Sequence, residues 1–485
     1  MSLKIYNSLS GEKEAFVPVV ENRASVYVCG PTVYSDAHLG HAKTYISFDV
    51  ILRYLRFCGL QTFYVQNITD VGHLLGDQDD GEDKILKKSR ETRQEPMALV
   101  ESYTRRYFDV MDQLGVVRPD ISPRATGHIP EQLEAIQSMI DQGLAYESNG
   151  SVYFNVSADA RYGILSRRNL DDLVSGTREE IRSDKRNPHD FALWKYADPS
   201  HLMQWTDPWS GKGFPGWHTE CVVMSTRYLG NSFDIHGGGM DLKFPHHECE
   251  LAQARALGKS FAKYWMHTNM LTIDGQKMSK SLGNFITLQD AISGHDPMVI
   301  RYFMISGHYR SVVDYSANAL SAAENALSRL WQVTRRLREK IPENTKPAQK
   351  HFQEFRQKFC QAMDDDFSTP QALAVLFDLS REVNALLNAT APDLDALIDA
   401  EHLFSTLGGE ILGIIPATLR QDASDQSILD DVMQVVIGLR KQFREEKNYQ
   451  KADYLRDRLG EIGIQIKDHK DQSTTWEHSK DSKPT

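Results

Sequence analysis

The feature that most constrains the fold is a strand–helix–strand order near the start of the chain. Ser25–Gly30 is rich in β-branched and aromatic residues and leads into a Gly-Pro pair, which is typical of a strand followed by a turn. Apolar residues recur at helical spacing from Ala42 to Phe57, and Phe63–Ile68 is again typical of a strand. This order predicts a right-handed crossover between two parallel strands.

The same alternation returns later in the chain. Strands are predicted at Phe233–His236 and Tyr264–Ile273, on either side of a helix at Pro245–Leu257. We therefore predict an α/β fold built on a doubly wound, Rossmann-type parallel sheet. Ligands of such sheets bind beyond the carboxyl ends of the strands, so the residues after Val28 and Ile235 are the first candidates for a site.

The remaining segments divide the chain further. Residues 101–204 mix helical and strand-like patterns and are interpreted as an insertion between the two halves of the sheet domain, residues 1–100 and 205–296. The helical pattern that follows predicts an all-α bundle over residues 297–420 and a small C-terminal region over residues 421–485. The predicted helices are Ala317–Leu337, Lys350–Met363, Pro370–Leu387 and Ile428–Phe443.

Composition indicates the class and compartment of the protein. Hydrophobic residues make up 41% of the chain and charged residues 25%, which is typical of a globular protein. The sequence contains neither a signal-peptide pattern nor a run of about 20 apolar residues, which predicts a cytoplasmic protein with no membrane association. Five scattered cysteines, an odd number, argue against a disulfide framework and favour reduced thiols or metal ligation.

The charge distribution bears on nucleic-acid binding. A net charge of -11 does not favour a polyanionic partner for the chain as a whole. A large RNA needs only a local basic face, however, and near the C-terminus basic residues are interleaved with Tyr449 and Tyr454. These basic residues are Arg440, Lys441, Arg444, Lys447, Lys451, Arg456, Arg458, Lys467 and Lys470. The pattern alone leaves open whether this is an RNA-binding surface or a solvated helix face with ion pairs.

Two short motifs carry groups that suit a polyphosphate. His38-Leu39-Gly40-His41 precedes the first predicted helix, where backbone N–H groups favour anions and a glycine lets a flat ring approach. Lys277-Met278-Ser279-Lys280-Ser281 lies on a loop bordered by glycines and suits a mobile clamp for phosphates. Singly, helix capping and an ordinary exposed loop are the simpler explanations. Together, the two motifs favour a nucleotide site.

This pair resembles the signatures of class I aminoacyl-tRNA synthetases, and further segments narrow the resemblance to the cysteinyl-tRNA synthetases. These segments are Val28-Cys29-Gly30-Pro31-Thr32-Val33-Tyr34, Asn67-Ile68-Thr69-Asp70, Phe191-Ala192-Leu193-Trp194-Lys195, Pro215-Gly216-Trp217-His218-Thr219-Glu220-Cys221, His236-Gly237-Gly238-Gly239-Met240-Asp241-Leu242, Phe244-Pro245-His246-His247-Glu248 and Met363-Asp364-Asp365-Asp366-Phe367. They occur in order along nearly the whole chain. The resemblance implies a monomer that activates L-cysteine with ATP and magnesium and loads it onto tRNA(Cys).

The resemblance also implies one zinc ion per chain. The two cysteines, the histidine and the glutamate that bind zinc in that family correspond to Cys29, Cys221, His246 and Glu250. His246 and Glu250 lie four residues apart on a predicted helix and so share one face, and Cys29 follows a predicted strand end. Spacing alone leaves Cys249 open as a competing ligand, because no Cys-x-x-Cys pair occurs.

A zinc ion would explain how cysteine is told from serine. An ordinary pocket gains only about 1–3 kcal/mol from a small apolar difference, whereas a thiophilic ion with an open position selects sulfur directly. No editing domain is therefore expected.

The remaining site residues also come from the resemblance. His38, His41, Lys277 and Lys280 correspond to the catalytic groups that stabilise charge on the phosphates. The adenosine site corresponds to Gly40, Gly237, Gly238, Gly239, Asp241 and Lys280, and the cysteine pocket to Thr32, Trp217 and His236. Packing is an alternative explanation for each, since a tryptophan beside a Pro-Gly pair is often simply buried.

Two rival functions fit parts of the pattern. A ligase that joins cysteine to an amino sugar shares the catalytic half and the zinc site, but the helices from Ala317 onward and the basic tail favour the synthetase. A noncatalytic zinc-containing RNA-binding protein would keep the fold without the activity, and the intact lysine loop argues against it. The tail departs from the family pattern at Ser473-Thr474-Thr475 and Glu477, so its anticodon contacts are not inferred residue by residue.

Overall fold

The computed structural model describes residues 3–74, 82–168, 184–199, 201–279, 282–342, 345–347, 349–419, 423–461, 463–468 and 474–478. The chain forms two compact units, Met1–Ala417 and Thr418–Thr485. Among the described residues, no helix is both long and apolar enough to cross a membrane.

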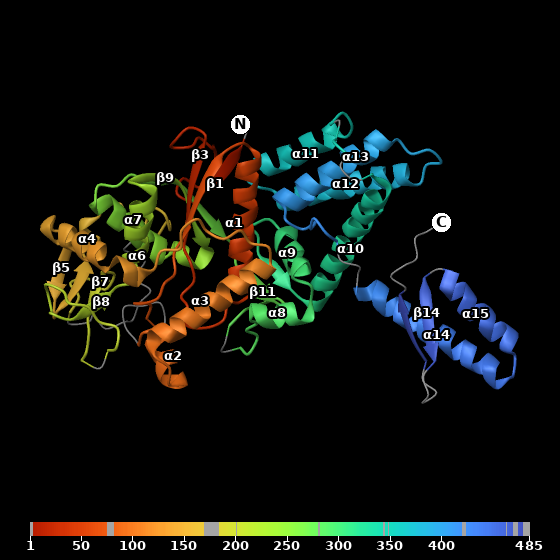
Figure 1. The fold of residues 1–485 in the computed structure, drawn as a ribbon. Coiled ribbons are helices and arrows are strands. Elements are labelled where there is room, and N and C mark those ends of the chain that lie inside the picture. The colour runs from red at the N-terminus through yellow and green to blue at the C-terminus, as the bar shows by residue number, and fades with distance from the viewer. Residues whose placement is uncertain are drawn as a thin grey trace. The chain divides into compact units, whose positions relative to one another are not determined.

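A four-stranded parallel sheet lies at the centre of the first unit (Figure 1). Its order is β10 (Phe261–Thr268), β9 (Ser232–Gly239), β3 (Arg23–Val28) and β4 (Gln61–Gln66). The chain runs outward from β3 to β4 and later from β9 to β10 on the other side, so β3 and β9 flank the point where the winding reverses. Ligands bind at the carboxyl edge beside such a reversal. The predicted doubly wound sheet is confirmed.

Helix α1 (Leu39–Phe57) connects β3 to β4 and is buried on nearly every side. It packs on the sheet and on α9 (Pro297–Ser306), which explains why apolar residues are not confined to one face of it. Helices α6 (Glu220–Leu229) and α7 (His246–Ala256) pack on each other and on the sheet, and the turn η4 (Met240–Lys243) links β9 to α7. The helices predicted at Ala42–Phe57 and Pro245–Leu257 are present with shifted ends.

The strand predicted at Tyr264–Ile273 is two separate strands, so the prediction of one continuous strand was wrong. After β10 the chain turns at Asn269, whose backbone N–H donates to Tyr309 O at 2.8 Å and whose side-chain amide donates to Arg310 O at 2.8 Å. Strand β11 (Leu271–Ile273) then joins a separate small sheet with β12 (Gln276–Lys277) and β13 (Val313–Tyr315).

A second, antiparallel sheet lies in the predicted insertion, in the order β5 (Ala145–Ser148), β6 (Ser151–Phe154), β7 (Phe191–Tyr196) and β8 (Gly213–Pro215). Helices α2 (Lys84–Thr92), α3 (Pro96–Gln113) and α4 (Ile129–Asp141) precede it, with short turns η2 (Ala125–His128) and η3 (Val156–Ala158). The predicted boundary at 100/101 falls inside α3, and the boundary at 204/205 falls between two paired strands. The insertion therefore extends to Pro215, because β8 completes the sheet by pairing with β7.

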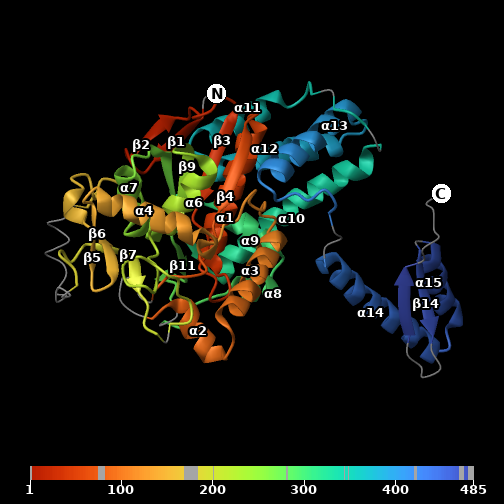
Figure 2. The same cartoon turned by 60° about the vertical axis from the view of Figure 1, so that its left-hand side comes forward.

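The rest of the first unit is largely helical and lies on the opposite side of the parallel sheet from β5–β8 (Figures 1 and 2). Its helices are α8 (Leu288–Gly294), α10 (Ala317–Lys340), α11 (Gln353–Asp364), α12 (Thr369–Leu387), α13 (Leu394–Leu403) and the π-helix η5 (Phe404–Ile411). Of these, α8, α13 and η5 were not predicted, and neither was the N-terminal hairpin of β1 (Lys4–Asn7) and β2 (Glu12–Ala15).

The second unit consists of α14 (Ala423–Glu445), α15 (Tyr449–Glu461) and an antiparallel pair, β14 (Ile464–Asp468) and β15 (Thr474–His478). Several basic residues of its predicted RNA-binding surface are engaged in ion pairs. Arg440 and Arg444 contact Asp468, and Arg456 and Arg458 contact acidic residues of α15. Tyr449 and Tyr454 are 59% and 64% exposed. Lys470 lies outside the described residues.

Candidate active site

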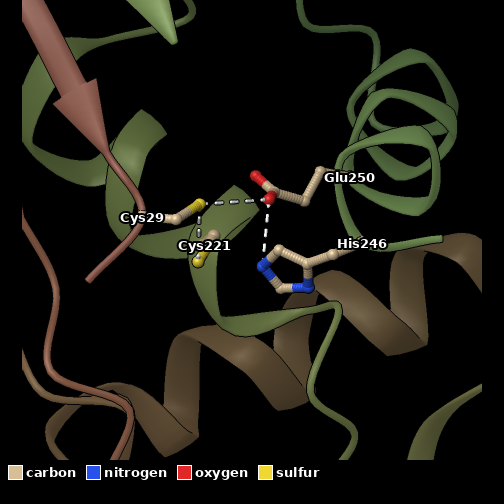
Figure 3. A group of neighbouring side chains, drawn as sticks. All are labelled: Cys29, Cys221, His246 and Glu250. Atoms are coloured by element: carbon tan, nitrogen blue, oxygen red, sulfur yellow. Dashed lines mark hydrogen bonds and ion pairs between the residues drawn. The ribbon is translucent and has the colours of Figure 1, made fainter. Parts of the chain in front are cut away.

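The four predicted metal ligands meet at the carboxyl edge of the parallel sheet. Cys29 directly follows β3, and Cys221 lies in the first turn of α6. His246 begins α7, and Glu250 lies one turn later on the same face. Figure 3 shows the four side chains pointing toward one another from these three elements.

The distances between these side chains suit a single tetrahedral ion. The four donor atoms all lie within 4.8 Å of one another. The sulfur atoms of Cys29 and Cys221 are 3.8 Å apart, Cys29 Sγ is 3.6 Å from Glu250 Oε1, and His246 Nε2 is 3.1 Å from the same oxygen. Zinc–sulfur bonds of about 2.3 Å in a tetrahedron place two sulfurs about 3.8 Å apart, so the residues present fit a zinc ion.

The same four side chains are completely enclosed. Burial raises the pKa of Cys221 to about 12 and that of Cys29 well above its usual value. Without a cation, both thiols therefore stay protonated at neutral pH. A bound divalent cation reverses this preference, because a coordinating thiol loses its proton.

A second group of donors overlaps the first. Cys29 and Glu250 also lie beside His236 and His247, and these four donors again fall within 4.8 Å of one another. His247 Nδ1 is 2.9 Å from His267 Nε2, which extends the histidine cluster into β10. His247 and His267 were not assigned from the sequence, although His247 stands directly beside His246. Cys249, the competing ligand that spacing left open, belongs to neither group of donors found among the described residues, and its sulfur lies 3.4 Å from Tyr162 Oη.

The residues expected to line a cysteine pocket gather beside this cluster. Trp217 stacks on His246 with ring centres 4.2 Å apart and on His73 at 3.9 Å. Thr32 is hydrogen-bonded to His73, and His236 Nε2 lies 3.6 Å from Cys29 Sγ. The structure thus brings Thr32, Trp217 and His236 together, with His73 as a neighbour that was not predicted to take part.

The two predicted catalytic histidines form the start of α1. His38 caps the helix, since its Nδ1 accepts a hydrogen bond from Gly40 N at 3.1 Å, and His41 Nδ1 accepts one from His38 N at 3.1 Å. In both rings the remaining nitrogen therefore carries the proton of the neutral tautomer. Burial, together with the adjacent His38 imidazole, holds the pKa of His41 well below its usual value. Both rings are thus suited to donate hydrogen bonds to phosphate oxygens.

The segment just after the Lys277-Met278-Ser279-Lys280-Ser281 motif lies beside the start of α1. Residues 285–288 run beside the start of α1, where Leu39 N donates to Ile286 O and Leu288 N donates to Ala37 O. The rings of His38 and Phe285 are 5.3 Å apart. Lys277 is exposed at the end of β12, and a side chain on Gly40 would lie within 3.9 Å of Met278. Lys280 and Ser281 lie outside the described residues.

Of the predicted adenosine residues, Gly237, Gly238 and Gly239 lie on β9 and Asp241 on η4, whereas Gly40 lies in the first turn of α1. A Cβ atom on Gly237 would lie 2.1 Å from the Phe48 ring, and one on Gly238 would lie 2.9 Å from the His247 ring. Packing against α1 and α7 therefore suffices to explain these two glycines. A Cβ on Gly239 would meet the carboxylate of Asp241, which is exposed on η4.

Comparisons with known proteins identify the family of the chain. Residues 15–325 match the family described as "tRNA synthetases class I (C) catalytic domain", and residues 358–416 match a DALR domain. The cysteine–tRNA ligase of Chlorobaculum tepidum is 48% identical over 99% of this chain and 99% of its own length. This chain belongs to the cysteine–tRNA ligase family.

Other members of the family support the same assignment. The cysteine–tRNA ligase of Deinococcus radiodurans is 49% identical over 97% of this chain and 96% of its own, and that of Thermus thermophilus is 44% identical over 97% and 98%. Among solved structures, a Mycobacterium tuberculosis methionyl-tRNA synthetase in complex with methionyl-adenylate superposes with a TM-score of 0.61 at 15% identity, covering 81% of this chain and 92% of its own. This likeness shows that cysteine–tRNA ligases share their fold with another synthetase.

Proposed function

We propose that this protein activates L-cysteine with ATP and transfers the cysteinyl group to tRNA(Cys), and that zinc bound by Cys29, Cys221, His246 and Glu250 selects the thiol. The observation that carries the proposal is the convergence of four metal donors at the carboxyl edge of the parallel sheet, in a chain of the cysteine–tRNA ligase family. The full-length match also favours this function over the amino-sugar ligase, because it includes the helical part and the second unit.

Selectivity follows from the donor set. A bound zinc ion would supply a thiophilic coordination position, and thiolate is a far better ligand for it than an alcohol. The protein's part is to orient the substrate at that position. Trp217, stacked between His73 and His246, forms a rigid wall, and Thr32 holds the His73 ring in place. Serine would then be rejected by the chemistry of its hydroxyl group without an editing step.

Adenylate formation needs no protein nucleophile. The cysteine carboxylate attacks the α-phosphate of ATP, which releases pyrophosphate, with magnesium on the phosphates. The neutral imidazoles of His38 and His41 donate hydrogen bonds to phosphate oxygens at the start of α1, where the helix dipole also favours anions. Lys277 and Lys280 add positive charge from the facing loop as negative charge develops. Gly239 and Asp241, at the end of β9 and on η4, hold the adenosine.

Transfer to tRNA needs a surface that reaches the anticodon as well as the active site. We assign residues 421–485 to the anticodon region, which follows the helical bundle of residues 297–420 with its DALR match. Four arginines of the second unit already contact acidic neighbours, so RNA contact falls chiefly on Lys441, Lys447, Lys451 and the exposed rings of Tyr449 and Tyr454. Exposed aromatic rings beside lysines suit unpaired bases and phosphates.

The experiment that tests the function is aminoacylation of total tRNA by the full chain with cysteine or serine, with zinc analysis of the same preparation. We expect cysteinyl-tRNA, no detectable seryl-tRNA and one zinc per chain. A preparation that supports cysteine-dependent pyrophosphate exchange but charges no tRNA would favour the amino-sugar ligase. Zinc-loaded protein that supports no exchange would indicate a noncatalytic RNA-binding protein.

A further inference from the structure

Two segments far apart in sequence must be held together for the metal cluster to exist. Cys29 follows β3, Cys221 lies in the first turn of α6, and the two residues are 192 positions apart. Their sulfur atoms nevertheless lie 3.8 Å apart, the separation that a single tetrahedral ion requires. An interaction outside the cluster that fixes β3 relative to α6 would therefore affect the metal directly.

A chain of hydrogen bonds makes this connection through the Asn67-Ile68-Thr69-Asp70 segment. Gly30 N, next to Cys29, donates to Asn67 Oδ1 at 2.8 Å, and Asn67 Nδ2 donates to Thr69 Oγ1 at 3.1 Å. The Thr69 hydroxyl in turn donates to Glu220 Oε1, next to Cys221. This series of hydrogen bonds thus begins next to Cys29 and ends next to Cys221.

Burial and close backbone packing keep this series of hydrogen bonds rigid. Asn67, Thr69 and Glu220 are 1%, 2% and 1% exposed, so water does not compete for their hydrogen bonds. A Cβ on Gly30 would lie 1.6 Å from Asn67 O, which shows how closely the two backbones approach. Thr69 N also donates to Pro31 O at 3.1 Å, so the segment is fixed by its backbone as well.

The stability of the fold does not explain why a glutamate is buried at position 220. A buried carboxylate is unfavourable compared with an apolar side chain of similar volume, even when it is hydrogen-bonded. Hydrogen bonds beyond the ligands commonly orient a metal site, and their loss lowers metal affinity. We propose that Asn67, Thr69 and Glu220 are positioning residues that set the distance between the Cys29 and Cys221 sulfurs. The inference rests on the zinc site of the proposed function.

The test is a set of threonine variants in the full chain. Thr69→Val keeps the shape of the side chain but removes the hydroxyl between Asn67 and Glu220, and Thr69→Ser restores it. Thr334→Val is the matched control, because Thr334 is also buried and its hydroxyl donates to Leu330 O at 2.9 Å within α10. Zinc affinity is measured by competition with a chromophoric chelator, and site geometry by the visible absorption of the Co²⁺-substituted protein.

We expect Thr69→Val to bind zinc about 10- to 100-fold more weakly, with an altered Co²⁺ spectrum, and Thr69→Ser and Thr334→Val to match the parent. Zinc affinity and a Co²⁺ spectrum equal to those of the parent in Thr69→Val would overturn the inference while leaving the zinc site intact. A parent protein that binds no zinc would instead overturn the proposed site itself.

Glu220→Gln provides a second check if Thr69→Val does not fold. The glutamine amide oxygen can still accept the hydrogen bond from Thr69, so a positioning role predicts parental zinc affinity. Glu220→Ala removes the acceptor and should therefore bind zinc more weakly. Equal losses in both Glu220 variants would show that the hydrogen bond from Thr69 does not set the zinc affinity, and would overturn the inference.

Discussion

At the scale of single residues, two buried cysteines provide a direct contrast. Cys221 lies 3.8 Å from Cys29 Sγ in the metal cluster, whereas Cys249, on α7, packs beside Tyr162. Both cysteines are buried, so the same substitution to serine can distinguish a metal ligand from a packing residue.

Cys221→Ser should lower zinc affinity by more than about 100-fold, because even groups beyond the ligands contribute 10- to 100-fold. The KM for cysteine in pyrophosphate exchange should rise in parallel. Cys249→Ser should keep full zinc content and lose only about 1–3 kcal/mol of stability, since it buries a hydroxyl group. Zinc analysis and exchange kinetics measure the effects on metal and substrate, and urea denaturation measures the loss of stability. A zinc-replete Cys221→Ser protein with parental kinetics would contradict the ligand assignment.

Sequence reasoning at this scale succeeded where residues form local patterns. His246 and Glu250 share a helix face, and that spacing is visible in the sequence. His73 could not be found in the same way, because its significance comes from stacking on Trp217, a residue far along the chain. A single sequence contains no record of such a contact.

At the scale of elements, the start of α1 combines capping with the proposed catalysis. His38 Nδ1 accepts a hydrogen bond from Gly40 N, and an asparagine can replace that cap but not the imidazole. His38→Asn should therefore keep the parental stability to within about 0.5 kcal/mol while lowering the rate of pyrophosphate exchange about 100-fold. His38→Ala should lose the same activity and also about 1 kcal/mol of stability. Urea denaturation and exchange assays separate the two roles; parental exchange in His38→Asn would show that the ring only caps the helix.

The stability that the contact between α1 and α9 contributes should depend on pH. Lys43 is buried and donates to Met304 O at 3.3 Å and His308 O at 3.2 Å, and burial lowers its pKa from 10.5 to about 8. Because the unfolded chain keeps this proton up to higher pH, the charged amine opposes folding at pH 7, and the opposition fades as pH rises.

The parent should therefore gain about 2 kcal/mol of unfolding free energy relative to Lys43→Met between pH 7 and pH 9.5. Urea titrations at several pH values measure this difference, and Lys87→Met, at an exposed lysine of α2, is the control. A constant difference between parent and Lys43→Met across this range would contradict the depressed pKa.

Element boundaries were predictable only where side-chain periodicity marks them. The division between β10 and β11 was missed because both strands are apolar, and the turn between them is fixed by bonds from Asn269 to Tyr309 and Arg310. The end of the insertion was missed for a similar reason: β8 is short, and only its pairing with β7 assigns it to the antiparallel sheet.

At the scale of the whole first unit, one buried arginine joins the sheet to the helical part. Arg301 on α9 is fully buried and forms an ion pair with Asp49 on α1. It also donates to Leu114 O at 3.1 Å, near the end of α3, and to Leu412 O at 2.9 Å, just after η5. These contacts are made by the same guanidinium group, so the sheet and the helices should unfold together.

Arg301→Met should lower the free energy of unfolding by about 3–5 kcal/mol, because it removes the buried charge partner of Asp49 and leaves that carboxylate only the partly exposed Arg53. Arg53 contacts the same carboxylate at 2.8 Å but is partly exposed, so Arg53→Met should lose only about 1 kcal/mol. If Arg301 couples the two parts, the Arg301→Met protein should also show a separate, earlier urea transition, and limited proteolysis should then cleave first within the α10–α13 helices. A single transition, with a loss no larger than that of Arg53→Met, would show that apolar packing between α1 and α9 is enough to couple them.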